Sequence, residues 1–114
     1  MRNGKALYSV KEVNERFRQI LQLSVTDFEE GYLFGSRARG DNRIDSDWDY
    51  LIVVDREISG SELRRLTGRL YMEFHKIVPD EPADIIIQTK SHFERSRSQL
   101  NHISHEVYKT GVKI

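Results

Sequence analysis

The sequence contains no cysteine among its 114 residues. Disulfide bridges, thiolate zinc sites and cysteine nucleophiles are therefore excluded, and the absence agrees with a reducing compartment. Proline is also scarce: Pro79 and Pro82 both fall in residues 78–84, which we interpret as a loop. No internal repeat or low-complexity stretch interrupts the chain, so we expect one domain over residues 1–114.

The chain has no excess of charge of either sign, because 18 Lys and Arg balance 18 Asp and Glu. The general field that attracts basic proteins to long nucleic acids is missing, so we expect no strong nucleic-acid binding. No stretch approaches the roughly 18 apolar residues that a membrane helix needs. The N-terminus shows no signal-peptide pattern either. These absences favour a cytoplasmic protein that does not engage a membrane.

Three helices are predicted from apolar residues at helical spacing, over residues 9–23, 59–77 and 91–109. Each opens with a serine followed three residues later by a glutamate, which is the pattern of a capping box. The first two capping boxes begin at Ser9 and Ser59, and the third begins at Ser91. The last helix is expected to bury one apolar stripe, formed by Phe93, Leu100, Ile103 and Val107.

Three short apolar runs are predicted to be strands, at residues 31–34, 49–54 and 83–88. The middle run is nearly continuous in β-favouring residues, so we expect it to be buried on both faces. Combined with the helices, the order is helix, strand, short turn, strand, helix, strand, helix. This order indicates an α/β fold in which a small mixed β-sheet is flanked by α-helices.

Candidate catalytic residues gather at one end of the expected sheet. Asp47 and Asp49 are two positions apart at a strand entrance, so both face one side, and Trp48 faces the other. A turn joins the first two strands in antiparallel fashion, and a helical crossover joins the second and third in parallel. The exit of the first strand at Gly35 and the entrance of the third at Asp84 should therefore lie beside this pair.

Three clustered carboxylates repel one another unless a cation neutralises them. Mg²⁺ suits such a site because it takes oxygen ligands from a few carboxylates, substrate phosphates and water. We therefore expect Asp47, Asp49 and Asp84 to be catalytic metal ligands for two Mg²⁺ ions roughly 4 Å apart, with a nucleoside triphosphate as substrate. Asp47 and Asp49 would bridge the ions, and Asp84 would hold the one that activates the acceptor.

The turn after the first strand offers groups that bind phosphate. Gly35 lacks a side chain, so its backbone can approach a phosphate closely. Ser36 offers a hydroxyl and an amide at what we interpret as the first turn of a short helix. Arg37 and Arg39 add positive charge for nucleotide binding, or else they are surface charges paired with nearby acidic residues.

Other polar and aromatic residues have simpler interpretations. His102 and His105 are three apart on the last predicted helix, and we interpret them as a solvated face rather than a metal site. Trp48 and Tyr50 are expected to pack in the core rather than stack on a base.

Together, GSRARG, SDWDYLIVV and ADIII resemble the minimal nucleotidyltransferases (MNT type) of the DNA polymerase beta superfamily. The resemblance covers most of the chain. The motif residues of that family are matched by Gly35, Ser36, Asp47, Asp49 and Asp84. Membership would imply a polymerase-beta-like nucleotidyltransferase fold, two magnesium ions, and transfer of a nucleoside monophosphate from a triphosphate to a hydroxyl.

Many members of that superfamily act beside an all-helical HEPN-type protein as antitoxin and toxin. The resemblance therefore implies an antitoxin that transfers AMP from ATP to a tyrosine of such a partner. Larger members carry a helical domain for which 114 residues leave no room, so we expect a partner to complete the site. Two alternatives stay open: an antitoxin that neutralises its partner by occlusion, and an enzyme acting on a small-molecule hydroxyl such as that of an aminoglycoside.

Overall fold

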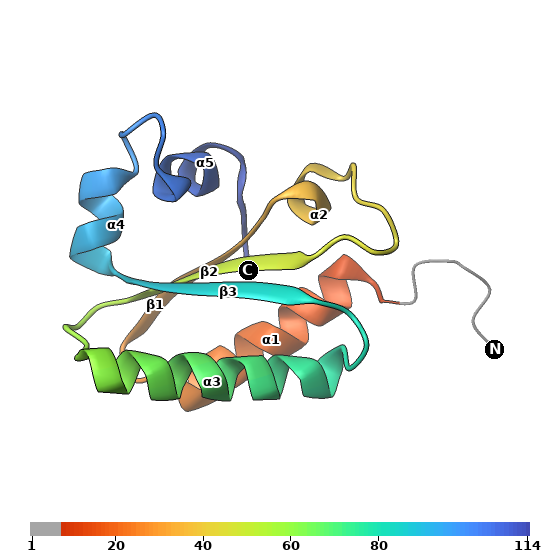
Figure 1. The fold of residues 1–114 in the computed structure, drawn as a ribbon, viewed down its shortest axis with the longest axis horizontal. Coiled ribbons are helices and arrows are strands. Elements are labelled where there is room, and N and C mark those ends of the chain that lie inside the picture. Colours follow the sequence, from red (N-terminus) through yellow and green to blue (C-terminus); the bar gives the residue numbers. More distant parts are fainter. Residues whose placement is uncertain (1–7) are drawn as a thin grey trace.

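The computed structural model describes residues 8–114 as a four-stranded sheet with helices on both faces (Figure 1). Along the chain the elements are α1 (Val10–Ser24), β1 (Phe28–Phe34), α2 (Ser36–Arg39), β2 (Trp48–Val54), α3 (Gly60–Ile77), β3 (Ala83–Thr89), α4 (Lys90–Ser96), α5 (Ile103–Thr110) and β4 (Val112–Lys113). None of the helices within residues 8–114 is both long and apolar enough to cross a membrane.

The sheet is mixed, as the sequence predicts, with the strand order β3-β2-β1-β4. β1 pairs antiparallel with β2, which follows it after a turn, whereas β3 returns through α3 and pairs parallel with β2. The short strand β4 was not predicted; it pairs antiparallel with β1 opposite Tyr32 and Leu33. The sequence gives little signal for β4 because it is only two residues long, and both are exposed.

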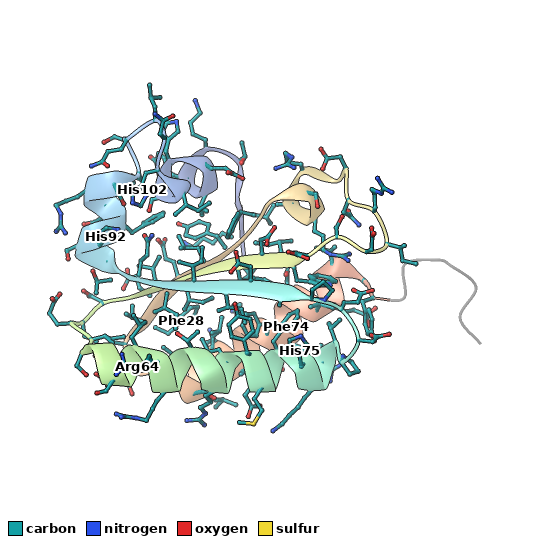
Figure 2. The ribbon with its side chains drawn as sticks, viewed as in Figure 1. Phe28, Arg64, Phe74, His75, His92 and His102 are labelled. Carbon is teal, nitrogen blue, oxygen red and sulfur yellow. The ribbon has the colours of Figure 1, made fainter. Side chains whose placement is uncertain are left out.

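Each face of the sheet has its own hydrophobic core, and β2 takes part in both. On the face covered by α1 and α3, the aromatic rings of Phe17, Tyr50 and Phe74 make edge-to-face contacts. Figure 2 shows Phe74 pointing from α3 toward the sheet. On the other face, Leu51 and Val53 pack with Phe93 and Val107 of α4 and α5, among others. All residues of β2 except Asp49 are buried, so the predicted two-sided burial is confirmed.

In the first two predicted capping boxes the serine caps the helix as expected, whereas the third predicted capping box is wrong. Ser9 and Ser59 each accept a hydrogen bond from the backbone amide three residues later. At the third site the N-cap is Thr89, whose hydroxyl accepts from the amide of His92. Thr89 and Ser91 are both good capping residues, and the parallel pairing of β3 with β2 extends through Thr89, which sets the helix start there.

The prediction of one helix over residues 91–109 is also wrong, because the chain turns between α4 and α5. Within this segment Ser96 donates to Ser104, and Ser104 donates to Gln88 of β3, all through side chains. These bonds fold α5 back against α4 and β3, which a continuous helix could not do. The turn also leaves Leu100 80% exposed, although the helical pattern placed it in the buried stripe.

Two substitutions distinguish this arrangement from a continuous helix. Phe93→Ala should destabilise the protein by about 3–5 kcal/mol, because it opens a cavity in the core beneath α4. Leu100→Ala should change the free energy of unfolding by less than about 0.5 kcal/mol, since its side chain lies in solvent. Urea unfolding of both variants measures the difference. A large loss for Leu100→Ala would contradict the turn between α4 and α5.

Candidate active site

The sheet register brings the predicted catalytic segments to one end of the fold. Phe34, the last residue of β1, is paired with Asp49 of β2. Asp49 is in turn paired with Asp84 near the start of β3. Paired residues on adjacent strands put their side chains on the same face, with backbones about 4.8 Å apart. The exit of β1 and the entrances of β2 and β3 therefore meet at the carboxylates, as the sequence predicts.

Asp49 is the centre of this cluster and is electrostatically strained. The pKa of its carboxyl group is raised to about 6, mainly by burial and then by three neighbouring carboxylates, in the order Asp47, Asp84 and Glu106. Arg39 opposes the rise. Asp47 and Asp84 are exposed, whereas Asp49 is half-buried, so Asp49 carries most of the desolvation cost. A cation bound here would relieve both the burial penalty and the repulsion.

Gly35 lies directly against the Asp49 carboxylate. It adopts a φ of 75°, a backbone conformation that favours glycine, and it is the N-cap of α2. A Cβ atom at this position would overlap Oδ2 of Asp49. Ser36 begins α2, so the interpretation of Ser36 as the first turn of a short helix is confirmed. Only glycine allows the backbone and the carboxylate to approach this closely.

The residues fit a hard divalent cation that is shared with a substrate. Within residues 8–114, no three His, Cys, Asp or Glu side chains converge closely enough to enclose a metal ion by themselves. Mg²⁺ does not require such a cage, since it is usually bound through one or two carboxylates together with phosphate oxygens and water. Asp49, with Asp47 and Asp84 beside it, supplies carboxylate oxygens of the required kind.

Arg37 is engaged in structural contacts rather than free for nucleotide. It is 5% exposed, and its Nη2 lies 3.3 Å from Oε1 of Glu81. The same guanidinium donates to the carbonyl of Ser46 and lies 4.2 Å above the ring of Trp48. The indole Nε1 of Trp48 donates to the same Glu81 oxygen at 2.7 Å. Arg37 is thus a buried ion-pair partner of Glu81, neither a phosphate ligand nor a surface charge.

Arg39 remains beside the cluster, and Glu106 joins it unexpectedly. Arg39 pairs with Asp41 at 3.3 Å and with Glu106 of α5 at 3.8 Å, so it is an ion-pair partner of a nearby acidic residue. Its side chain is about half exposed, which leaves it accessible to a ligand. Glu106 was missed because its position depends on the turn between α4 and α5. A carboxylate on a helix carries no signal of its own in the sequence.

The two histidines of the C-terminal segment serve local structure. The Nδ1 atom of His102 caps α5 by accepting from the amide of Ser104. His105 Nδ1 lies 2.8 Å from the carbonyl oxygen of Arg97. Both rings are only partly exposed, so the prediction that these histidines form a fully solvated helix face is wrong. Figure 2 shows His102 near His92 of α4. Trp48 and Tyr50 are fully buried, which confirms their assignment to the core.

The raised pKa of Asp49 predicts a pH-dependent stability. A carboxyl group with a folded-state pKa of about 6, above its ordinary 3.8, is destabilised when ionised, so stability falls as the pH rises through this window. In EDTA, Asp49→Asn should therefore melt at a higher temperature than the natural sequence at pH 7.5 but not at pH 4. The exposed Asp45→Asn is the control and should show no such gain. An equal gain at both pH values would contradict the assignment.

The buried ion pair predicts a sharp contrast between two neighbouring arginines. Arg37→Met should cost about 3 kcal/mol of stability, because it leaves the Glu81 carboxylate buried without its partner. Arg39→Met should cost less than about 0.5 kcal/mol, because its ion pairs are solvent-exposed. Chemical denaturation measures both. Adding Glu81→Gln to Arg37→Met should recover part of the loss, and equal small effects of the two arginines would refute the buried pair.

No curated protein matches the chain in sequence. A toxin–antitoxin structure with AMP-PNP has a TM-score of 0.61 and 19% identity, over 88% of this chain and 70% of that one. The MntA-HepT toxin–antitoxin gives a TM-score of 0.59 and 16% identity, over 90% and 69%. A Sulfolobus solfataricus protein described as a nucleotidyltransferase gives 0.59 and 23%, over 90% and 76%.

Identities this low show a shared fold, and the mixed sheet with its flanking helices is that of these structures. The family follows from sequence. The family model named "Polymerase beta, Nucleotidyltransferase" matches residues 15–114, a span that runs from α1 through β4 and includes every residue of the carboxylate cluster. The chain belongs to the polymerase beta nucleotidyltransferase family.

Proposed function

We propose that this nucleotidyltransferase moves AMP from ATP to a hydroxyl group, a tyrosine, on a separate helical HEPN-type toxin, and so acts as the antitoxin. The observation that carries the proposal is the half-buried Asp49, strained by Asp47 and Asp84 and packed against Gly35. Such a cluster is unfavourable while its carboxylates are ionised, and a bound cation stabilises it. A stable fold alone would not require three carboxylates to lie together at this end of the sheet.

In the proposed reaction, Asp47, Asp49 and Asp84 would hold two Mg²⁺ ions. Bound there, Mg²⁺ would neutralise negative charge on the attacking oxygen and on the leaving pyrophosphate. The acceptor oxygen forms a bond to the α-phosphorus of ATP, the bond to pyrophosphate breaks, and the hydroxyl proton is released. The absence of a side chain at Gly35 leaves room for the Asp49 carboxylate against the backbone, and Ser36 adds a hydroxyl at the start of α2. Arg39, which is about half exposed beside the cluster, can contact the nucleotide.

Support for a toxin partner comes from structures of similar fold. Two of the similar structures are of toxin–antitoxin proteins, and one of those contains AMP-PNP, an ATP analogue. Asp47 and Asp84 are exposed at the end of the sheet where β2 and β3 begin. A protein acceptor can therefore reach the site, and binding by the partner would orient its hydroxyl for attack.

The proposal is tested by mixing the protein with Mg²⁺, ATP and a HEPN-type protein encoded beside it, and measuring intact masses. We expect the partner to gain the mass of one AMP, or of several AMP units if transfer repeats. Asp49→Asn should reduce the rate by at least about a hundredfold, since it removes a charge on which metal binding depends. Asp45→Asn, an identical change in the exposed turn, should retain activity.

Two experimental outcomes would contradict this proposal and support a different function. If Asp49→Asn neutralises the partner as well as the natural sequence does, and no mass change occurs with either, the protein acts by occlusion. If the partner is never modified but a small-molecule hydroxyl such as that of an aminoglycoside is, the acceptor class is wrong and the transferase chemistry stands.

A further inference from the structure

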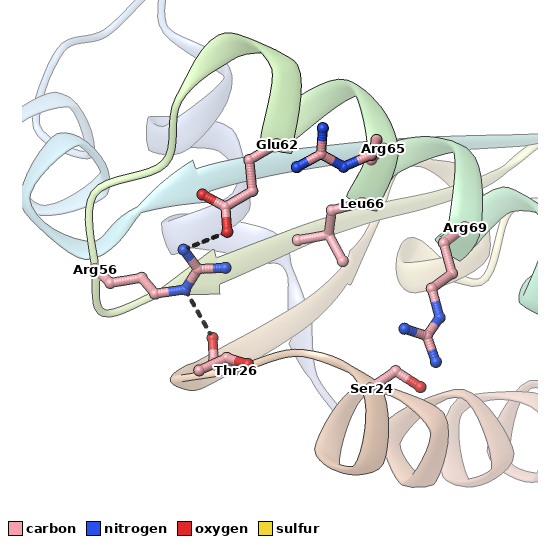
Figure 3. A pocket seen from close by; sticks show the side chains of 7 residues that line it. All are labelled: Ser24, Thr26, Arg56, Glu62, Arg65, Leu66 and Arg69. Atoms are coloured by element: carbon pink, nitrogen blue, oxygen red, sulfur yellow. Dashed lines mark hydrogen bonds and ion pairs between the residues drawn. The ribbon is translucent and has the colours of Figure 1, made fainter.

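A cavity lies beyond the end of β2, whereas the carboxylate cluster lies at the start of that strand. Figure 3 shows the side chains that line the cavity. Its volume is about 360 Å³, within the range of small-molecule sites. It forms where the end of α1, the segment before β1 and the connection after β2 meet α3. Six of its seven lining residues are polar or charged: Ser24, Thr26, Arg56, Glu62, Arg65 and Arg69.

Three arginines make this cavity strongly basic in a chain that has no net charge. Arg56 is held in place, since its Nη1 lies 2.9 Å from Oε2 of Glu62 and its Nε donates to the carbonyl of Thr26 at 3.4 Å. Glu62 also lines the cavity and neutralises one of the three charges. A net charge of about two positive units therefore faces the cavity.

Arg65 and Arg69 have no acidic partner among residues 8–114. They are four positions apart on α3, so they lie on the same side of the helix, where like charges destabilise it. Figure 3 shows them on either side of Leu66, with Ser24 of α1 facing Arg69. An anion bound between them would remove the repulsion.

We propose that this cavity binds a small phosphate-bearing ligand, with its phosphate chain held by Arg56, Arg65 and Arg69. The planar guanidinium group donates paired hydrogen bonds that match phosphate oxygens. The hydroxyls of Ser24 and Thr26 at the rim can donate further hydrogen bonds. No aromatic residue lines the cavity, so it offers no stacking platform of the kind that single-stranded nucleic acids use.

This site is separate from the carboxylate cluster and does not depend on the proposed transferase function. Asp49 is at the start of β2, and Arg56 follows its end, which corresponds to roughly 20 Å of extended chain. The cluster is negative and needs a cation before it can accept phosphate. The arginine cavity needs none, so binding in EDTA isolates it from the active site.

The test uses inorganic tripolyphosphate and ATP in EDTA at constant ionic strength, followed by calorimetry and thermal melting. Both ligands should bind and raise the melting temperature, because they bind only the folded state. Arg65→Gln combined with Arg69→Gln should weaken binding by about tenfold or more. Arg64→Gln combined with Arg95→Gln removes the same charge from exposed positions outside the cavity and should leave binding intact. Asp49→Asn should also leave it intact.

Comparing the affinities of the two ligands shows whether the cavity recognises a nucleotide or only a chain of phosphates. Tighter binding of ATP than of tripolyphosphate would assign a nucleotide, and equal binding would assign the phosphate chain alone. The proposal is overturned if neither ligand binds in the millimolar range, or if both double-arginine variants lose affinity equally. It is also overturned if an RNA oligonucleotide binds through Arg65 and Arg69 while tripolyphosphate does not.

Discussion

The buried ion pair between Arg37 and Glu81 is the interaction on which the arrangement of the active-site end depends. Burying two charges is costly unless their partners are well placed, and here Trp48 and the carbonyl of Ser46 satisfy them. The pair joins α2 to the loop before β3, across the first residue of β2. His75 holds the same loop, because its Nε2 lies 3.0 Å from the carbonyl oxygen of Glu81. This charge pair thus ties together the segments at which β2 and β3 begin, and these segments carry the carboxylate cluster.

The same pair shapes the electrostatics of the carboxylate cluster. Because Arg37 is neutralised by Glu81, it contributes little positive charge at the surface where Asp49 lies. Arg39 is the one cation among the main influences on the pKa of Asp49, and it is shared with Asp41 and Glu106. The cluster therefore keeps an uncompensated negative charge. A site with this property selects for a polyvalent cation and discriminates against free anionic nucleotide.

The sequence is most informative where one local pattern determines the structure. The apolar run of β2 predicts its burial on both faces, and the turn before it and the helical crossover after it predict the strand pairing that places Asp49 beside Asp84. Prediction from sequence fails where the structure depends on contacts between polar residues that are far apart in the chain. Ser104 resembles an exposed helical position, yet it is buried and bonded to Gln88, which breaks the expected helix. In the sequence, Arg37 looks like a phosphate ligand, because its ion-pair partner Glu81 lies 44 positions away and no local pattern links the two.

The zero net charge conceals a separation of charge along the sheet. Carboxylates gather where β2 begins, and arginines gather beyond its end. If both proposed sites bind phosphate, they differ in the form they accept, because the acidic end requires a complex with a divalent cation and the basic cavity favours the free anion. A phosphate ligand would then distribute between the two ends according to the free Mg²⁺ concentration. The charge separation therefore links occupancy of the arginine cavity to the same cation that the transferase reaction would use.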